Sequence, residues 1–98
     1  MAKAKENKIV IESDVAKYLT DAIHNSRKLQ ADIAIEAGFP KPNMITMIKQ
    51  GRSKMPLAKV KLLADALEID AKELLRLCFE EYQPGNWAVI EEIFREQS

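Results

Sequence analysis

Apolar side chains recur at helical spacing along most of the chain. Ser13 is suited to cap a helix N-terminus, and apolar positions follow it at helical spacing to about Ser26. The same spacing continues in five further segments, which begin near Gln30, Pro42, Pro56, Asp70 and Asn86. No strand pairing is needed to account for residues 13–98, so the pattern predicts an all-α fold.

Several residues between these segments are typical of helix ends. Gly38 follows the second helix where a left-handed C-cap is needed, and Pro42 suits the first position of the third helix, which we expect to end at Lys49. Three further boundaries are predicted: Pro56 at the start of a helix, Asp70 with Glu73 as a capping box, and Asn86 as the N-cap of the last helix.

The length of the chain and the positions of these helix ends predict one domain with an additional segment at each end. Residues 1–12 are lysine-rich and without periodicity apart from the short apolar run 9–11, so we expect a flexible basic arm. Residues 13–83 are expected to share a single core, because 98 residues cannot fill two. Residues 84–98 follow a Pro-Gly break and form a separate C-terminal helix in this prediction.

Composition limits the classes of function. No apolar run approaches the ~20 residues that span a membrane, and no hydrophobic stretch of a secretory signal follows the N-terminus. We therefore expect a cytoplasmic protein without a membrane partner. The chain has one histidine, His24, and one cysteine, Cys78, which are too few for a zinc cluster, a disulfide or a Cys/His catalytic pair. We expect no cofactor, no metal site and no enzymatic activity.

The net charge of zero conceals a strong polarity along the chain. Residues 1–61 carry twelve lysines and arginines against six acids, whereas residues 62–98 carry three against nine. Residues 37–64 contain no acid and six basic side chains. A polyanion is therefore expected to meet this stretch rather than the acidic C-terminal part.

The second and third predicted helices have the features of a helix-turn-helix. Both are short, and the turn between them contains Gly38, which tolerates a left-handed backbone. Ala34 is small enough to let two helices approach closely. In such a motif the second helix enters the major groove of a DNA duplex.

At these residues the chain resembles the Xre family of phage and bacterial repressors, to which lambda repressor and Cro are related. The resemblance covers about residues 14–76 and is carried by Gln30-Ala-Asp-Ile-Ala34, Gly38, Ile45-x-x-Ile48, Gly51-Arg-Ser-Lys-Met-Pro56 and Leu63-Ala-x-Ala-Leu67-x-Ile69-Asp70-x-x-x-Leu74. It implies a five-helix lambda-repressor-like DNA-binding domain, to which this chain adds a C-terminal helix. It also implies a homodimer that occupies a pseudo-palindromic operator in double-stranded DNA and represses transcription.

The turn departs from the family pattern, because the spacing from Gly38 to Ile45 is one residue longer here. One interpretation keeps the family spacing and buries Met44 and Met47. The other lengthens the turn and buries Ile45 and Ile48. We favour the longer turn, because it buries the stiffer side chains and aligns Gly51 and Pro56 with the family.

The third helix supplies the candidate base-reading residues. Those that the longer turn directs outward, or that directly precede the helix, are Lys41, Pro42, Asn43, Thr46 and Met47. The resemblance aligns Pro42, Asn43 and Met47 with family residues that read bases. Asn43 is the strongest candidate, because an amide both donates to and accepts from adenine.

The candidate phosphate-binding residues are Lys28, Gln30, Lys49, Arg52, Ser53 and Lys54. Gln30 and residues 52–54 match family positions that bind the DNA backbone. Lys28 and Lys49 are added for their charge alone, and for each an ordinary solvated lysine is an equally good interpretation.

The last predicted helix has a broader apolar face than a small core can absorb. Its large side chains are Trp87, Ile90, Ile93 and Phe94, which we expect at a dimer interface, with packing inside the chain as the alternative. Three functions remain open: a repressor, the antitoxin-type regulator of a toxin-antitoxin operon with a toxin as protein partner, or a helical protein-interaction module that binds no DNA.

Overall fold

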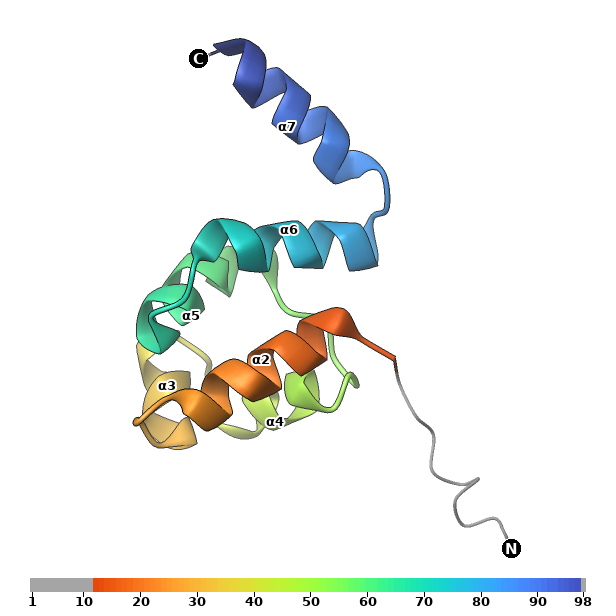
Figure 1. Ribbon diagram of the computed structural model, residues 1–98. Helices are drawn as coiled ribbons and strands as arrows, with labels where there is room; N and C mark the ends of the chain where they lie inside the picture. Colours follow the sequence, from red (N-terminus) through yellow and green to blue (C-terminus); the bar gives the residue numbers. More distant parts are fainter. Residues whose placement is uncertain (1–11, 98) are drawn as a thin grey trace, which may run out of the picture.

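The computed structural model describes residues 12–97, and all the regular elements in that range are helical (Figure 1). They are α2 (Asp14–Asn25), α3 (Gln30–Glu36), α4 (Asn43–Lys49), the 3₁₀ turn η1 (Leu57–Lys59), α5 (Val60–Leu67), α6 (Ala71–Tyr82) and α7 (Asn86–Gln97). The all-α prediction is therefore confirmed for this part of the chain. The apolar run 9–11 and all but the last residue of the expected basic arm lie outside the described residues.

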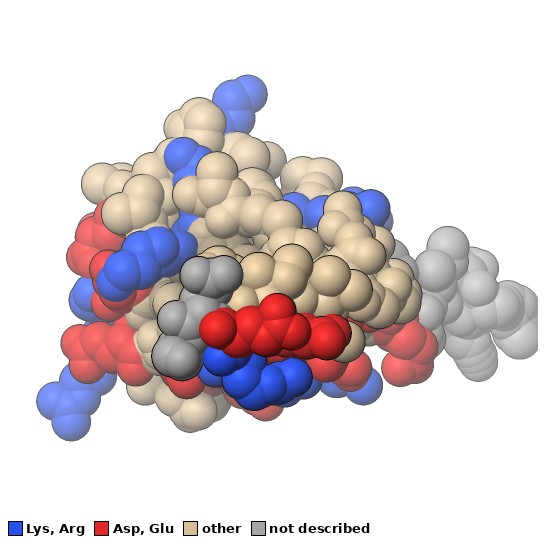
Figure 2. Space-filling model, turned by 90° about the horizontal axis from the view of Figure 1, so that it is seen from above, with Lys and Arg blue, Asp and Glu red and all other residues tan. Residues whose placement is uncertain are grey.

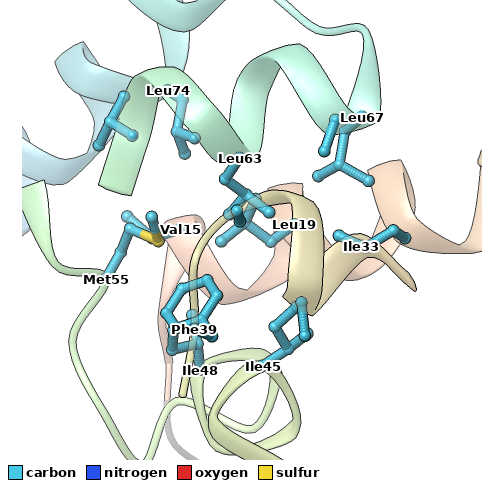
Figure 3. Packing of buried hydrophobic residues seen from close by; sticks show 14 of the residues in the cluster. Val15, Leu19, Ile33, Phe39, Ile45, Ile48, Met55, Leu63, Leu67 and Leu74 are labelled. Carbon is cyan, nitrogen blue, oxygen red and sulfur yellow. The ribbon is translucent and has the colours of Figure 1, made fainter. Parts of the chain in front are cut away.

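Helices α2 to α6 pack around one core, and α7 projects from it (Figure 1). α2 contacts both α4 and α6, whereas α5 lies against α3 and α6. The largest fully buried side chains come from α2, α3, α5, α6 and the loop before η1: Val15, Leu19, Ile33, Met55, Leu63, Leu74 and Cys78. In Figure 3, Leu19 and Leu63 lie at the centre of this cluster, and Phe39, Ile45 and Ile48 pack on its lower side.

The turn between α3 and α4 follows the longer of the two predicted registers. Ile45 and Ile48 are 2% and 3% exposed, while Met47 is 37% exposed and Met44 is only partly buried at the edge of the core. Gly38 has a φ of +78°, as its predicted place at the end of α3 requires, and the next N–H, of Phe39, donates to Ala34 O at 2.9 Å. Burial of two β-branched side chains thus fixes which face of α4 is exposed.

Three predicted helix boundaries need correction, at Pro42, Pro56 and Asn86, while the fourth, Asp70 as the N-cap of α6, is confirmed. Pro42 is the N-cap of α4 rather than its first residue, and Pro56 precedes the 3₁₀ turn η1 instead of opening an α-helix directly. The capping box of α6 is half formed, because Asp70 accepts from Lys72 N while Glu73 bonds Arg76. Asn86 lies inside α7, where its amide donates to the side chain of Gln83.

The N-terminus of α2 is capped both locally and from a distant part of the chain. Ser13 Oγ accepts from Ala16 N at 3.0 Å, as an N-cap does, and donates to Glu81 Oε2 at 2.7 Å. The other oxygen of Glu81 accepts from Val15 N at 3.0 Å. A carboxylate of α6 therefore satisfies one orphan N–H group of α2, that of Val15, and ties the two helices together.

Helix α7 is joined to the body mainly at its first turn. Trp87 is 7% exposed and packs on Phe79 of α6, with ring centroids 5.8 Å apart. Further along α7, Val89, Ile93 and Phe94 are 55%, 51% and 68% exposed. Within residues 12–97, none of these helices combines the length and apolar character that crossing a membrane requires.

Candidate nucleic-acid interface

The outward face of α4 carries polar and flexible side chains on a rigid base. Ile45 and Ile48 hold one side of the helix in the core, and Asn43 and Met47, four residues apart, lie exposed on the other. Lys41 and Pro42 are exposed just ahead of the helix. Four of the five predicted base-reading residues are therefore accessible on one short segment.

The fifth, Thr46, is partly buried in a hydrogen-bond network between α3 and α4. Gln30 Nε2 donates to Thr46 Oγ1 at 2.8 Å, and Lys49 Nζ donates to Gln30 Oε1 at 2.8 Å. Gln30 therefore uses both ends of its amide to hold α4 against the start of α3. Its amide nitrogen keeps one further proton and the Lys49 ammonium keeps two, so both can still donate to an anion.

Residues 51–54 form a loop fixed to the end of α4. Gly51 has a φ of +76°, and the N–H groups of Arg52 and Ser53 donate to Met47 O at 2.9 and 3.3 Å. Arg52 and Lys54 are exposed and Ser53 is partly buried. The predicted phosphate-binding loop is thus held at a defined position beside the exposed face of α4.

The far side of this loop rests on the end of α6. Lys54 Nζ lies 5.4 Å from the ring centroid of Tyr82, and Tyr82 Oη accepts from Met55 N at 2.8 Å. A hollow of about 380 Å³ opens here, lined by Ser13, Gly51, Arg52, Ser53, Lys54, Glu81 and Tyr82. Glu81 and Tyr82 were not among the predicted site residues, because both lie more than twenty residues along the chain from the loop.

Lys28, which was predicted to bind phosphate, makes two hydrogen bonds within the chain. Its ammonium donates to Glu36 Oε1 at 2.7 Å and to Ala66 O, near the end of α5, at 2.8 Å. These bonds join the segment before α3 to α5. Lys28 thus stabilises the fold, and its charge is matched by a carboxylate.

The basic side chains near α4 have no acidic neighbours in sequence. Lys41, Lys49, Arg52 and Lys54 all fall in the acid-free stretch 37–64. Glu81 is the acid that lines the hollow beside the loop, and its two oxygens accept from Ser13 and Val15 at the start of α2. The charged side chains that α4 and its loop contribute to this surface are therefore all basic, while Asp21 of α2 lines a hollow beside Lys49.

Helix α7 supplies a second, chemically different surface. A groove of about 530 Å³ lies between α6 and α7, lined by Lys72, Leu75, Trp87, Ile90, Glu91, Phe94 and Arg95. Figure 2 views the molecule from the α7 side. Acidic and basic side chains lie next to each other there, at the border of a surface made of uncharged residues. The burial of Trp87 corrects its predicted place on a dimer face, because its ring is already covered by α6, while Ile90 remains partly buried and Ile93 and Phe94 remain exposed.

The one cysteine lies inside the core. Cys78 is fully buried, and this burial raises the pKa of its thiol to about 11, with a smaller contribution from Glu81. The thiol is therefore protonated at neutral pH, and its role is packing. Over the described range, no group of three histidine, cysteine, aspartate or glutamate side chains is placed to hold a metal ion.

No protein-family model, curated protein or solved structure matches this chain. Three regions of the molecule carry side chains suited to binding a partner: α4, the loop 51–54 and the surface of α7. On the first two, amide, thioether and cationic groups share one exposed region. On α7, exposed aliphatic and aromatic groups predominate.

Proposed function

We propose that this protein is a sequence-specific regulator of transcription that binds double-stranded DNA, with α3 and α4 as a helix-turn-helix of the Xre, lambda-repressor-like type. In this proposal a homodimer occupies a pseudo-palindromic operator and represses the adjoining promoter. The observation that carries it is the exposed face of α4, where Asn43 and Met47 lie between the basic groups of Lys41, Lys49 and the loop 52–54.

The dimensions and chemistry of α4 suit a major groove. A helix with its side chains is about 10–12 Å across, and the major groove of B-DNA is about 12 Å wide. Asn43 in the first turn of α4 presents an amide, which can bond adenine through a donor and an acceptor together. Met47, one turn later on the same face, offers an apolar contact to a thymine methyl group.

The loop and the start of α3 are suited to the phosphate backbone. Arg52, Ser53 and Lys54 offer cationic and hydroxyl donors at a position fixed by the end of α4. Gln30 and Lys49 can also donate to phosphate through the N–H protons that their own hydrogen bonds leave unused. These contacts set the register and supply the salt-dependent part of the affinity, while α4 supplies the specificity.

A second copy of the chain is the partner proposed for α7. Homodimer interfaces bury mainly apolar side chains. α7 exposes Val89, Ile93 and Phe94, and part of the α6/α7 groove is apolar as well. The acidic residues of α7 are repelled by phosphate, which places this interface away from the DNA. The same exposed face favours a second candidate, an antitoxin-type regulator in which α7 binds a toxin as well as its own copy.

Selection of bound duplexes from a random pool tests the proposal directly. We expect enrichment of a pseudo-palindrome whose half-sites lie roughly 34–36 Å apart, about one turn of DNA. Affinity for the selected duplex should fall steeply as salt concentration rises. Failure to enrich any sequence, together with salt-independent interaction with nucleic acid, would contradict DNA recognition and leave a protein-interaction module.

A further inference from the structure

Tyr82 makes two contacts with the segment that ends the basic loop. Its ring lies beneath the ammonium of Lys54, 5.4 Å from Nζ to the ring centroid. Its hydroxyl oxygen accepts from the backbone N–H of Met55 at 2.8 Å, across 27 residues of sequence. One side chain at the end of α6 therefore holds both the side chain of Lys54 and the backbone that follows it.

An aromatic partner suits a lysine that must remain available to an anion. A free lysine side chain samples many rotamers, and placing it over a ring reduces that freedom. The ring attracts the ammonium through its quadrupole without neutralising the charge, whereas a carboxylate would compete with phosphate for it. Lys54 is thus oriented by Tyr82 and keeps its positive charge.

The neighbouring acid is kept occupied. Glu81 precedes Tyr82 and lines the same hollow as Lys54, where a free carboxylate would attract the lysine. Both of its oxygens accept hydrogen bonds from the start of α2, one from Ser13 Oγ and one from Val15 N. The negative charge of Glu81 therefore lies against the N-terminus of α2.

The hydroxyl of Tyr82 is neutral and accepts the hydrogen bond from the Met55 backbone. Partial burial raises the pKa of Tyr82 and outweighs the hydrogen bond from Met55, which lowers it. The phenol is therefore uncharged at neutral pH. Met55 itself is 2% exposed, so the loop is held between a buried methionine and the end of α6.

We propose that Tyr82 is a positioning residue for duplex binding: it orients Lys54 toward a DNA phosphate through its ring and fixes the loop backbone through its hydroxyl. This role rests on the proposed DNA-binding function, and it extends the interface to α6, outside the helix-turn-helix. Tyr82 itself touches no DNA in this proposal. Its effect passes through Lys54 and the Met55 backbone.

The test combines Tyr82→Leu and Tyr82→Phe with Lys54→Ala in the full-length protein. Binding of a labelled duplex of random sequence is followed by fluorescence anisotropy over a range of salt concentrations, and folding is followed by circular dichroism. Tyr18→Leu is the matched control: Tyr18 is a partly buried tyrosine of α2 whose pKa is raised by burial and by the nearby carboxylates of Glu73 and Asp70, at the opposite end of α6 from Tyr82. Proton NMR reports the Lys54 ε-methylene shift, and hydrogen exchange reports the Met55 amide.

Tyr82→Leu is expected to weaken duplex binding about two- to fivefold, the range of an exposed cation–π contact, and to have a clearly smaller effect in a Lys54→Ala background, where only the contact with the Met55 backbone is lost. Tyr82→Phe keeps the ring and should retain most of the binding, with faster exchange of the Met55 amide. The Lys54 ε-protons should be shifted upfield in the unmodified protein and in Tyr82→Phe, but not in Tyr82→Leu. Tyr18→Leu should leave binding unchanged.

Three results would overturn the positioning role. They are unchanged duplex binding by Tyr82→Leu, an equal loss with and without Lys54, and an unshifted Lys54 signal in the unmodified protein. If the unmodified protein binds no duplex while the Lys54 shift is present, the proposed function fails and the role in DNA binding fails with it. The two failures are thereby distinguished.

Discussion

The faces of α4 and α7 differ in how each is held and in what each offers. α4 has seven residues and is fixed on its inner side by Ile45 and Ile48 and at its ends by the Gln30 network and the loop 51–54. α7 has twelve residues, and its largest buried side chain, Trp87, lies in the first turn. The first helix is small but rigidly placed, whereas the second is longer and attached mainly at one end.

The two faces also differ in the chemical character of their side chains. The α4 face combines an amide with lysines and an arginine in a stretch without acids, which suits a polyanion with a readable edge. The α7 face combines exposed apolar side chains with acids, which suits another protein surface. A precise polar contact requires a rigid support, while an apolar contact gains free energy from area and tolerates some movement.

The largest expected effect separates the two faces by detaching α7. Trp87→Ala should cost about 3 kcal/mol of packing where α7 meets α6, because a large aromatic is removed from a buried site. We expect loss of helical signal from α7 and of self-association, measured by circular dichroism and analytical ultracentrifugation. Trp87→Phe is the control, since it keeps an aromatic ring on Phe79 and removes an indole N–H that has no hydrogen-bond partner among the described residues.

A substitution on the exposed part of α7 should affect assembly without affecting the fold. Ile93→Asp places a charge in the exposed apolar face and should shift the dimer toward monomer by at least about 2 kcal/mol. Binding to a single half-site should stay the same, while binding to the full operator should weaken. Ala88→Asp, an equal charge at an exposed position of the same helix, is the control. A monomeric unmodified protein at operator-binding concentration would exclude the α7 dimer.

Asn43→Ala tests whether the α4 face reads sequence. Loss of a bidentate amide contact should cost about 1–3 kcal/mol on the selected operator and relax the preference at one base pair in each half-site. Affinity for random duplexes should hardly change. Equal loss on the selected and random duplexes would instead assign Asn43 to the backbone.

Ser13→Ala tests how far the rigidity of this region depends on α6. The serine is the N-cap of α2 and also donates to Glu81, so we expect a loss of about 1 kcal/mol in the free energy of unfolding. Ser13→Asp would restore the local cap but place a second carboxylate beside Glu81. If stability depends on the long-range bond as well as the cap, this variant should remain less stable than the unmodified protein in urea denaturation.

The smallest effect is expected for Lys54→Ala, which removes one phosphate contact. Affinity should fall about two- to fivefold and equally on all duplexes, as expected for Tyr82→Leu, and the slope of log affinity against log salt should decrease by about 0.9. Lys61→Ala is the matched control, because Lys61 already pairs with Asp65 on α5 at 2.7 Å. A change in sequence preference caused by Lys54→Ala would contradict its assignment to the backbone.

Features that depend on neighbouring residues were predictable from the sequence. Helical periodicity located the six α-helices of residues 12–97 and selected Ile45 and Ile48 as the buried face of α4, because a helix repeats its faces every few residues. Gly38 marked the end of α3 through its unusual φ, and Ser13 marked the start of α2 through its hydroxyl. The end of α5 carries no such marker in the sequence, because the left-handed position there is occupied by Glu68 and not by a glycine.

Contacts between distant residues were decided only by the tertiary structure. Glu81 caps α2 from 66 to 68 residues away, Tyr82 supports the loop across 27, and Lys28 reaches Ala66 across 38. Trp87 was predicted to lie on an exposed apolar face, but it packs on Phe79 of the same chain. The sequence by itself therefore determined which helices form and which of their faces are polar, because those properties follow from local spacing. The support of the basic loop and the attachment of α7 depend on how helices meet in space, which local spacing does not specify.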